Sequence, residues 1–281
     1  MEIEKNIVLE RPSKKPIVID TFYSKDKQNQ PIVIFCHGYK GFKDWGAWNL
    51  MAETIAKAGF CFIKFNFSHN GGTVEQPIDF PDLNAFGNNN YTKELDDLND
   101  VIDWTINQYK NNRNINVNNI ALIGHSRGGG IAIIHASEDQ RISQLITLAS
   151  VSDFGTRTYT VGNLKEWKQN GVKYVINGRT KQKMPHYIQF YEDFKTNEDR
   201  LNIESSIKKT NIPILIIHGN KDTSVEVKEA KTLKKWYPKA KQKIIENADH
   251  VFNTKHPWDK KTLSNELKEV TTSIIDFLKK N

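Results

Sequence analysis

The sequence is poor in cysteine and in long apolar runs. Its 281 residues include 2 cysteines, Cys36 and Cys61, each inside a short apolar run. They have neither the spacing of metal ligands nor that of a disulfide framework, so we expect no structural metal and no disulfide-stapled domain. No apolar run approaches the length of a membrane span, and residues 1–5 contain no hydrophobic signal region. We therefore expect no membrane partner and a cytoplasmic location.

The chain also lacks an arginine-rich tract or a basic stripe. Its 40 Lys and Arg residues against 33 Asp and Glu give a formal net charge of +7. The lysines are scattered, often in pairs such as Lys208-Lys209 and Lys279-Lys280. Dispersed lysines are typical of a solvated surface, whereas nucleic-acid binding requires clustered basic side chains. We expect no nucleic-acid partner. The oligomeric state is left open, with a homodimer as one option.

Short apolar runs alternate with segments of helical periodicity along most of the chain. This alternation predicts one α/β domain over residues 1–281. We expect right-handed crossovers, a mostly parallel sheet and helices on both of its faces. In such a sheet, ligands bind outside the carboxyl ends of the strands. The expected strands are 3–10, 17–23, 31–36, 60–67, 120–124, 144–149, 212–218 and 242–246. The expected helices are 48–58, 91–109, 225–236 and 260–280, and one that follows residue 126.

Residues 152–205 interrupt this alternation after the sixth strand. They contain no clean buried strand, and a long excursion inside a compact domain is usually a lid or cap. The alternative is a peripheral aromatic mini-core without a ligand role. We expect a cap that lines the substrate pocket, with Tyr159, Trp167 and Arg179 as candidate contacts. Residues 76–90, rich in proline and asparagine, are expected to be a surface loop. The aromatic residues of the expected cap are Phe154, Tyr159, Trp167, Tyr174, Tyr187, Phe190, Tyr191 and Phe194.

The sequence I-A-L-I-G-H-S-R-G-G-G-I-A at residues 120–132 predicts a strand, a tight turn and a helix. In a G-x-S-x-G elbow the serine occupies a strained corner above the carboxyl end of the sheet. The flanking glycines, Gly124 and Gly128, allow the strand and helix backbones to approach closely. Ser126 is therefore the candidate nucleophile.

A serine hydroxyl needs a base to take its proton and an acid to orient that base. In enzymes with such an elbow, the acid and the histidine follow the serine in the chain. His250 lies on a loop between the last expected strand and helix, and His256 is its rival. Asp222 follows the buried strand 212–218 through a glycine turn, and Asp153 and Glu226 are the weaker alternatives. We expect Asp222 and His250 to complete the triad.

The tetrahedral oxyanion needs two hydrogen-bond donors. The backbone amide of Arg127, at the start of the elbow helix, is one candidate. The loop after the third strand, 37–41, supplies the other through the amide of Tyr39. The side chains of Tyr39 and Arg127 are expected to be incidental to this oxyanion hole, and His37 and His125 are expected to be structural.

These motifs resemble those of serine hydrolases with the α/β-hydrolase fold. Within that superfamily the chain is similar to dienelactone-hydrolase-like and feruloyl/cinnamoyl-esterase-like proteins, and to the catalytic domains of prolyl-oligopeptidase-type peptidases. Dienelactone hydrolases proper have a cysteine where Ser126 stands. The resemblance is strongest from residue 31 to the C-terminus. Its motifs are H-G-Y-K-G at 37–41, G-H-S-R-G-G at 124–129, H-G-N-K-D at 218–222 and A-D-H at 248–250.

The resemblance implies an enzyme that cleaves small-molecule carboxylic esters through an acyl-enzyme on Ser126, without a metal or organic cofactor. Two other functions remain open. The same triad would serve a small aminopeptidase or acylpeptide hydrolase, although no propeller domain precedes the fold. A binding protein with a vestigial site is the alternative from a different class, because fold alone does not fix function.

Overall fold

A computed structural model describes residues 1–159 and 162–280, without the side chain of Tyr159. Its strands are β1 (Glu2–Leu9), β2 (Ile17–Tyr23), β3 (Gln30–Cys36), β4 (Cys61–Phe65), β5 (Ile115–His125), β6 (Ile142–Leu148), β7 (Val172–Ile176), β8 (Lys183–Tyr187), β9 (Ile214–Gly219) and β10 (Lys241–Ile245). Its helices are α1 (Trp48–Lys57), α2 (Leu83–Gly87), α3 (Tyr91–Tyr109), α4 (Arg127–Glu138), α5 (Gly155–Tyr159), α6 (Leu164–Asn170), α7 (Gln189–Thr196), α8 (Ile203–Lys209), α9 (Val227–Trp236) and α10 (Asn265–Lys280).

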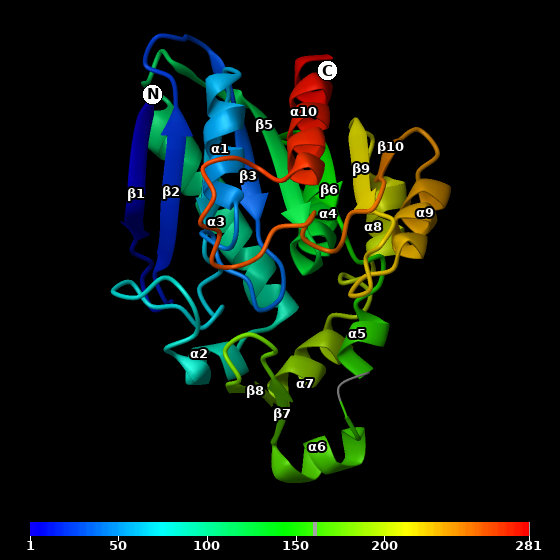
Figure 1. Ribbon diagram of the computed structural model, residues 1–281. Coiled ribbons are helices and arrows are strands. Elements are labelled where there is room, and N and C mark those ends of the chain that lie inside the picture. Colours follow the sequence, from blue (N-terminus) through cyan, green and yellow to red (C-terminus); the bar gives the residue numbers. More distant parts are fainter. Residues whose placement is uncertain (160–161, 281) are drawn as a thin grey trace.

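One large sheet forms the centre of the molecule, with strand order β1-β2-β4-β3-β5-β6-β9-β10. β1 and β2 form an antiparallel hairpin, and β2 also pairs antiparallel with β4. The remaining neighbours, from β4 to β10, are parallel. The carboxyl ends of these parallel strands therefore lie along one edge, as Figure 1 shows. The mostly parallel sheet predicted from the sequence is present.

The apolar runs form strands buried on both faces because alternate side chains enter two different cores. In β3, Ile32 and Ile34 belong to the core under α3, α4 and α9. Val33 and Phe35, between them in sequence, belong to the core under α1 and α10. Helices thus cover both faces, as expected.

The structure adds elements to two segments that the sequence left irregular. Within the expected loop 76–90, α2 begins after Asp82, whose side chain accepts a hydrogen bond from the Ala85 amide at 2.8 Å. Within 152–205, β7 and β8 form a separate antiparallel hairpin. The middle of β8, including Met184 and His186, is buried. The expectation of no clean buried strand there was wrong for β8, a continuous strand of five residues with Pro185 at its centre.

The segment predicted to be a cap, residues 152–205, is called the cap below. Its described part lies beyond the carboxyl ends of β3 and β5 and beside α2 (Figure 1). It packs on the main body through aromatic rings. Tyr91 of α3 stacks on Phe154, with ring centroids 4.0 Å apart, and also contacts Phe190 and Phe194. The last cap residues begin α8, which packs against α4 in the main body. The cap is therefore anchored to the elbow helix at its end and to α3 in its middle.

A buried cluster of four charges fixes the loop between β3 and α1. Asp20 of β2 lies opposite Lys64 of β4 in the strand register, and both side chains are fully buried. The amine of Lys43 in the loop lies 2.7 Å from Asp20, and Asp44 pairs with both lysines. Because the two acids and two bases balance, none of these charges is buried without a partner. The cluster ties the loop that follows β3 to the edge of the sheet.

Candidate active site

Ser126 lies at the turn between β5 and α4 in a strained backbone conformation. Its φ of 56° and ψ of −120° belong to a region that residues other than glycine rarely adopt. A Cβ atom at Gly124 would press on the backbone of Gly128, and one at Gly128 would press on the carbonyl of Cys36. The glycines of the elbow are thus required by close backbone approach, as the sequence predicts.

The structure brings Ser126, His250 and Asp222 together. The Ser126 hydroxyl lies 3.0 Å from Nε2 of His250. On the other side of the ring, Nδ1 of His250 lies 2.7 Å from Oδ2 of Asp222. A neutral imidazole held this way donates from Nδ1 and presents Nε2 as the acceptor for the serine proton. His250 lies 28 positions after Asp222 and 124 positions after Ser126 in the sequence. In the structure the three side chains form one continuous series of hydrogen bonds.

The Asp222 carboxylate is held ionised by converging donors. Burial raises the pKa of Asp222, but hydrogen bonds from His218 and His250 outweigh this and hold the pKa well below its usual range. Its other oxygen accepts the amides of Ser224 and Val225, both at 2.8 Å. An anionic Asp222 can therefore stabilise the imidazolium that forms when His250 takes a proton.

The alternative acids and bases lie elsewhere. Asp153 is exposed and caps α5 through the amides of Gly155 and Thr156. Glu226 pairs with Lys228 on the surface. His256 accepts a hydrogen bond from the Gly46 amide at 3.0 Å, and His135 of α4 lies 3.2 Å from Asp139, directly after the end of that helix. In the described part of the chain, the hydrogen bonds of the Ser126 hydroxyl and the His250 ring instead join these two residues to each other and to Asp222.

The loop after β3 runs directly beside the serine. A Cβ atom at Gly38 would lie 2.8 Å from Cβ of Ser126. His37 supports the loop: its Nδ1 donates to the Gly38 carbonyl at 2.9 Å, and its Nε2 accepts the Phe67 amide at 3.2 Å. Within the described residues, neither the Tyr39 amide nor the Arg127 amide donates a hydrogen bond. Two free donors therefore belong to the segments that meet at Ser126.

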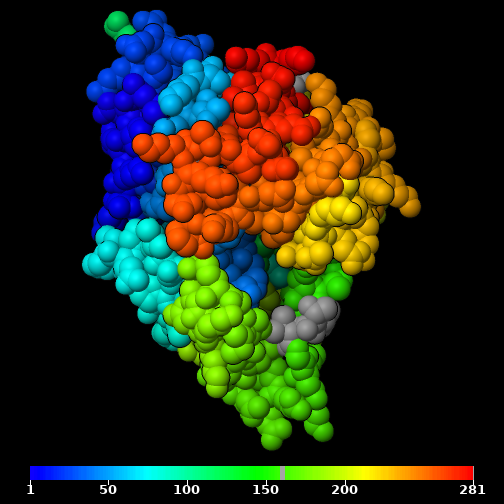
Figure 2. All heavy atoms as spheres, in the orientation of Figure 1, coloured from blue at the N-terminus to red at the C-terminus, as the bar shows by residue number. Residues whose placement is uncertain are grey.

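A pocket of about 380 Å³ opens in front of Ser126. Figure 2 shows the molecular face hollowed between the green cap and the orange and yellow C-terminal segments, from which several lining residues come. The Arg127 guanidinium lies over the Tyr39 ring, 4.4 Å from its centroid. The Tyr39 hydroxyl lies 2.9 Å from Nε2 of His186 in the cap. The lining residues are Tyr39, Lys40, Tyr91, Ser126, Arg127, Val151, Phe154, Arg157, His186, Phe190, Ser224, Val225 and His250.

The cap contributes to this pocket through residues other than those expected. Trp167 is buried inside the cap and donates from Nε1 to the His186 carbonyl at 2.8 Å. Arg179 pairs with Asp79 in the loop before α2. Neither is among the described residues that line the pocket, and the side chain of Tyr159 lies outside the described part of the structure. Phe154 and Phe190 were visible only as members of an aromatic-rich stretch, and nothing in the sequence singled out Tyr91, Lys40 or His186.

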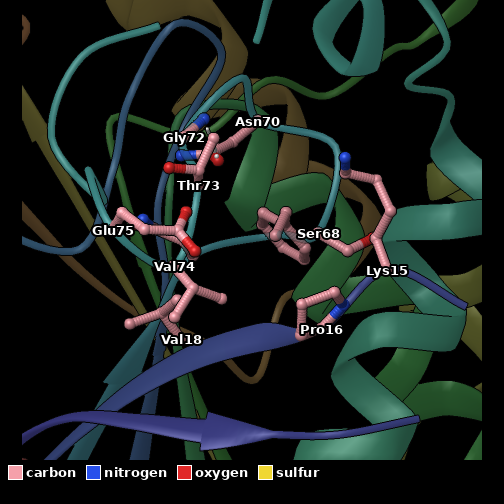
Figure 3. Close-up of a pocket in the computed structure, with 11 residues that line it drawn as sticks. Lys15, Pro16, Val18, Ser68, Asn70, Gly72, Thr73, Val74 and Glu75 are labelled. Carbon is pink, nitrogen blue, oxygen red and sulfur yellow. Dashed lines mark hydrogen bonds between the residues drawn. The ribbon is translucent and has the colours of Figure 1, made fainter. Parts of the chain in front are cut away.

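A second cavity, of about 260 Å³, lies between the start of β2 and the loop after β4 (Figure 3). Three of its polar side chains already have partners in the protein. Lys15 pairs with Asp82 at 2.8 Å, and the Asn70 side chain bonds to the backbones of Gly41 and Gly72. Ser68 donates to Asp97. The cavity at Ser126, which combines a nucleophile with a base, therefore remains the candidate active site.

The described residues offer neither a metal site nor a membrane-spanning helix. No group of three or more His, Cys, Asp or Glu side chains among them could hold a metal ion. No described helix is both long enough and apolar enough to cross a membrane.

Comparison with known proteins supports the fold and a family. The BD-FAE family model matches residues 19–237, whereas no curated protein sequence matches significantly. Est1E from Butyrivibrio proteoclasticus has a TM-score of 0.72 at 17% identity, covering 99% of this chain and 98% of that one. Est1E with ferulic acid bound gives 0.74 at 18%, covering 98% of both chains. A dienelactone hydrolase from Anabaena variabilis gives 0.63 at 13%, covering 99% and 97%. The predicted α/β-hydrolase fold is confirmed.

Proposed function

The chain belongs to the BD-FAE family of feruloyl-esterase-like α/β hydrolases, and from this premise we propose that it hydrolyses carboxylic esters through an acyl-enzyme on Ser126. The observation that carries the proposal is the continuous contact from Ser126 through His250 to Asp222, at 3.0 and 2.7 Å. Both distances are short enough for hydrogen bonds, as a nucleophile, a general base and an orienting acid require, and this supports the proposal. The pocket at Ser126 is the place for the ester.

Acylation begins when Nε2 of His250 takes the Ser126 proton as Oγ attacks the acyl carbon. Negative charge then develops on the former carbonyl oxygen, and the amides of Tyr39 and Arg127 stabilise it. When the carbon–oxygen bond of the ester breaks, His250 returns its proton to the leaving alkoxide. Asp222 stays ionised throughout and stabilises the imidazolium.

Deacylation repeats the same steps with water. His250 takes a proton from a water molecule, whose oxygen attacks the acyl carbon of the acyl-enzyme. The bond to Oγ breaks, the proton returns to Ser126, and the free acid leaves. No redox change occurs, and no group beyond this chain and water enters the balance.

A fluorophosphonate probe tests the nucleophile. We expect it to label Ser126, because the probe needs a serine whose proton a base can accept. Ser126→Ala should lose labelling and lower kcat by at least ~10³-fold on any ester that the wild type hydrolyses, while the protein stays folded. The measurements are peptide mapping of the adduct, ester hydrolysis and thermal unfolding.

Ser152→Ala is the matched control. Ser152 lies near the carboxyl end of β6, but its hydroxyl bonds to Glu229 and has no histidine partner. We expect this variant to keep labelling and activity. An adduct on another serine would refute the assignment of Ser126. Hydrolysis of aminoacyl amides in preference to esters would instead favour the peptidase alternative.

A further inference from the structure

The pocket in front of Ser126 has an unbalanced charge. Three cationic side chains, Lys40, Arg127 and Arg157, belong to its lining, and no Asp or Glu does among the described lining residues. Arg157 has an acidic partner that does not line the pocket, because its guanidinium lies 3.1 Å from Glu229. Arg127 has one as well, since its guanidinium lies 3.3 Å from Glu94. Among the described residues, Lys40 therefore contributes a positive charge without an acidic partner, and Arg127 contributes N–H donors that this one contact leaves unused.

Arg127 is poorly satisfied for a buried guanidinium. Its side chain is 13% exposed and makes one hydrogen bond, from Nη1 to Oε1 of Glu94 at 3.3 Å, among the described residues. A guanidinium carries five N–H donors, so most of them are unused. Its remaining surroundings are aromatic, with Cζ 5.2 Å from the Tyr91 centroid and 5.4 Å from that of Phe190. These rings hold the cation in place without satisfying its donors.

Lys40 has no acidic partner in the described structure. Its amine lies 5.0 Å from the centroid of the Tyr39 ring, and Arg127 lies 4.4 Å from the same centroid. Burial, followed by the Arg127 charge, lowers the pKa of Lys40. Its backbone has a φ of 54°, which is unfavourable for a lysine. Two cations thus share one aromatic ring at the pocket and repel each other.

We infer that this pocket takes an ester that carries a carboxylate in addition to the scissile bond, and that Lys40 and Arg127 bind that carboxylate. An anion beside both would relieve their repulsion and use the free donors of Arg127 in charge-assisted hydrogen bonds. The inference rests on the proposed ester hydrolysis at Ser126 and deepens it by naming a substrate class. The carboxylate can belong to the acyl group or to the alcohol.

Paired substrates distinguish these two sources. For the acyl group, the pair is the p-nitrophenyl monoester of adipic acid and p-nitrophenyl hexanoate, which differ by a carboxylate in place of a methyl group. For the alcohol, the pair is 4-acetoxybenzoate and its methyl ester. The readout is the ratio of kcat/KM for the acidic ester to kcat/KM for the neutral one. We expect this ratio to exceed one in the wild type for at least one pair.

Lys40→Met should lower that ratio about tenfold, since the variant keeps the volume of the side chain and loses its charge. Lys40→Glu should lower it further, because like charges then repel. Lys57→Met, on an exposed position of α1, removes the same charge far from the pocket and should leave the ratio unchanged. Raising the salt from about 0.05 M to about 0.5 M should also lower the wild-type ratio, by screening. The salt measurement needs no variant to fold.

The failures of the two proposals are distinguishable. The carboxylate site would be overturned by ratios near one for both pairs, or by ratios that neither Lys40→Met nor salt changes. Hydrolysis of the neutral esters would in that case still support the proposed esterase activity. Wild-type protein that hydrolyses no ester and takes no fluorophosphonate at Ser126 would overturn the esterase and, with it, this inference.

Discussion

At the scale of single residues, the Asp222 carboxylate is held by partners on both of its oxygens. One carboxylate oxygen accepts two loop amides, and the other meets His250 at 2.7 Å and His218 at 3.3 Å. The amides fix the orientation of the carboxylate, so that the remaining oxygen must face the imidazole. His218 is buried and donates from Nε2 to the Val225 carbonyl at 2.7 Å, which holds the far side of the same loop. The loop after β9 is therefore built to position this acid.

Asp222→Asn tests that role. If the amide oxygen keeps the two loop amides, the amide NH₂ faces Nδ1 of His250 and forces the imidazole into the wrong tautomer. Nε2 then carries a proton and cannot accept the one from Ser126. We expect kcat on an ester substrate to fall by about 10⁴-fold while the fold is retained. Steady-state kinetics, with circular dichroism for the fold, provide the measurement.

Asp153→Asn is the matched comparison, because Asp153 also follows a strand of the sheet but is exposed and caps a short helix. Its effect on kcat should stay small. If Asp153→Asn abolishes activity and Asp222→Asn does not, the acid follows β6 and the assignment made here is wrong.

At the scale of elements, the meeting of Ser126, Asp222 and His250 could be predicted because each residue directly follows a strand or its turn. Ser126 follows β5, Asp222 follows β9 and His250 follows β10, and the carboxyl ends of parallel strands meet at one edge. The sequence indicates both the strands, as apolar runs, and the turns, as glycines. Their convergence then follows from strand order alone.

Other elements could not be predicted because their signals are tertiary or too short. α2 spans only five residues and begins with an N-cap hydrogen bond to the Asp82 side chain. The surrounding prolines and asparagines are typical of a loop, so the sequence did not indicate this helix. Among the described strands, β7 and β8 pair only with each other, and their sequences lack a periodic apolar pattern. The ion pair between Asp20 and Lys64 could not be predicted, because it depends on the register in which β2 and β4 pair. The pocket walls combine α3, the cap and the loop after β3, which no local pattern connects.

The elbow makes an element-scale prediction about stability. A methyl group at Gly124 would meet backbone atoms of Gly128 and Gly129, which cannot move without shifting α4 against β5. We expect Gly124→Ala to lower the free energy of unfolding by about 2 to 3 kcal/mol, as overpacking does in a rigid interior. Urea unfolding followed by circular dichroism would measure it.

Gly178→Ala is the control for that experiment. Gly178 lies in the turn between β7 and β8, where a Cβ atom would meet nothing within 4 Å. Its substitution should change the free energy of unfolding by no more than ~0.5 kcal/mol. Equal effects of the two substitutions would show that the elbow backbone adapts, contrary to the close approach described above.

At the scale of the whole molecule, buried neutral histidines join separate parts of the structure around the site. His37 fixes the loop after β3, and burial lowers its pKa to about 4. His125 donates from Nε2 to the His250 carbonyl at 2.9 Å, and burial lowers its pKa to about 3. His186 links the cap to Tyr39; burial, with Arg127 and Lys173 adding to it, lowers its pKa to about 3. Protonation of any of them opposes the native packing.

This arrangement predicts how stability depends on pH. A histidine in the unfolded chain has a pKa of ~6.5. Below that pH each of these histidines is protonated in the unfolded chain but stays neutral in the native state. The free energy of unfolding should therefore fall as pH drops from ~6.5 towards ~4, by about 1.4 kcal/mol per pH unit for each such histidine. Ionised carboxylates with lowered pKa, such as Asp222, contribute their loss mainly below this window.

His186→Gln isolates one of these contributions. Glutamine can keep a polar contact with the Tyr39 hydroxyl but does not titrate. The variant therefore takes up one proton fewer on unfolding than the wild type does. Between pH ~5.5 and ~4.5 the slope of unfolding free energy against pH should become shallower by about 1.4 kcal/mol per unit, whatever the variant's stability at neutral pH. Urea unfolding at several pH values measures the slope in both proteins. Identical slopes would mean that His186 accepts a proton in the native state, contrary to the lowered pKa that its burial implies.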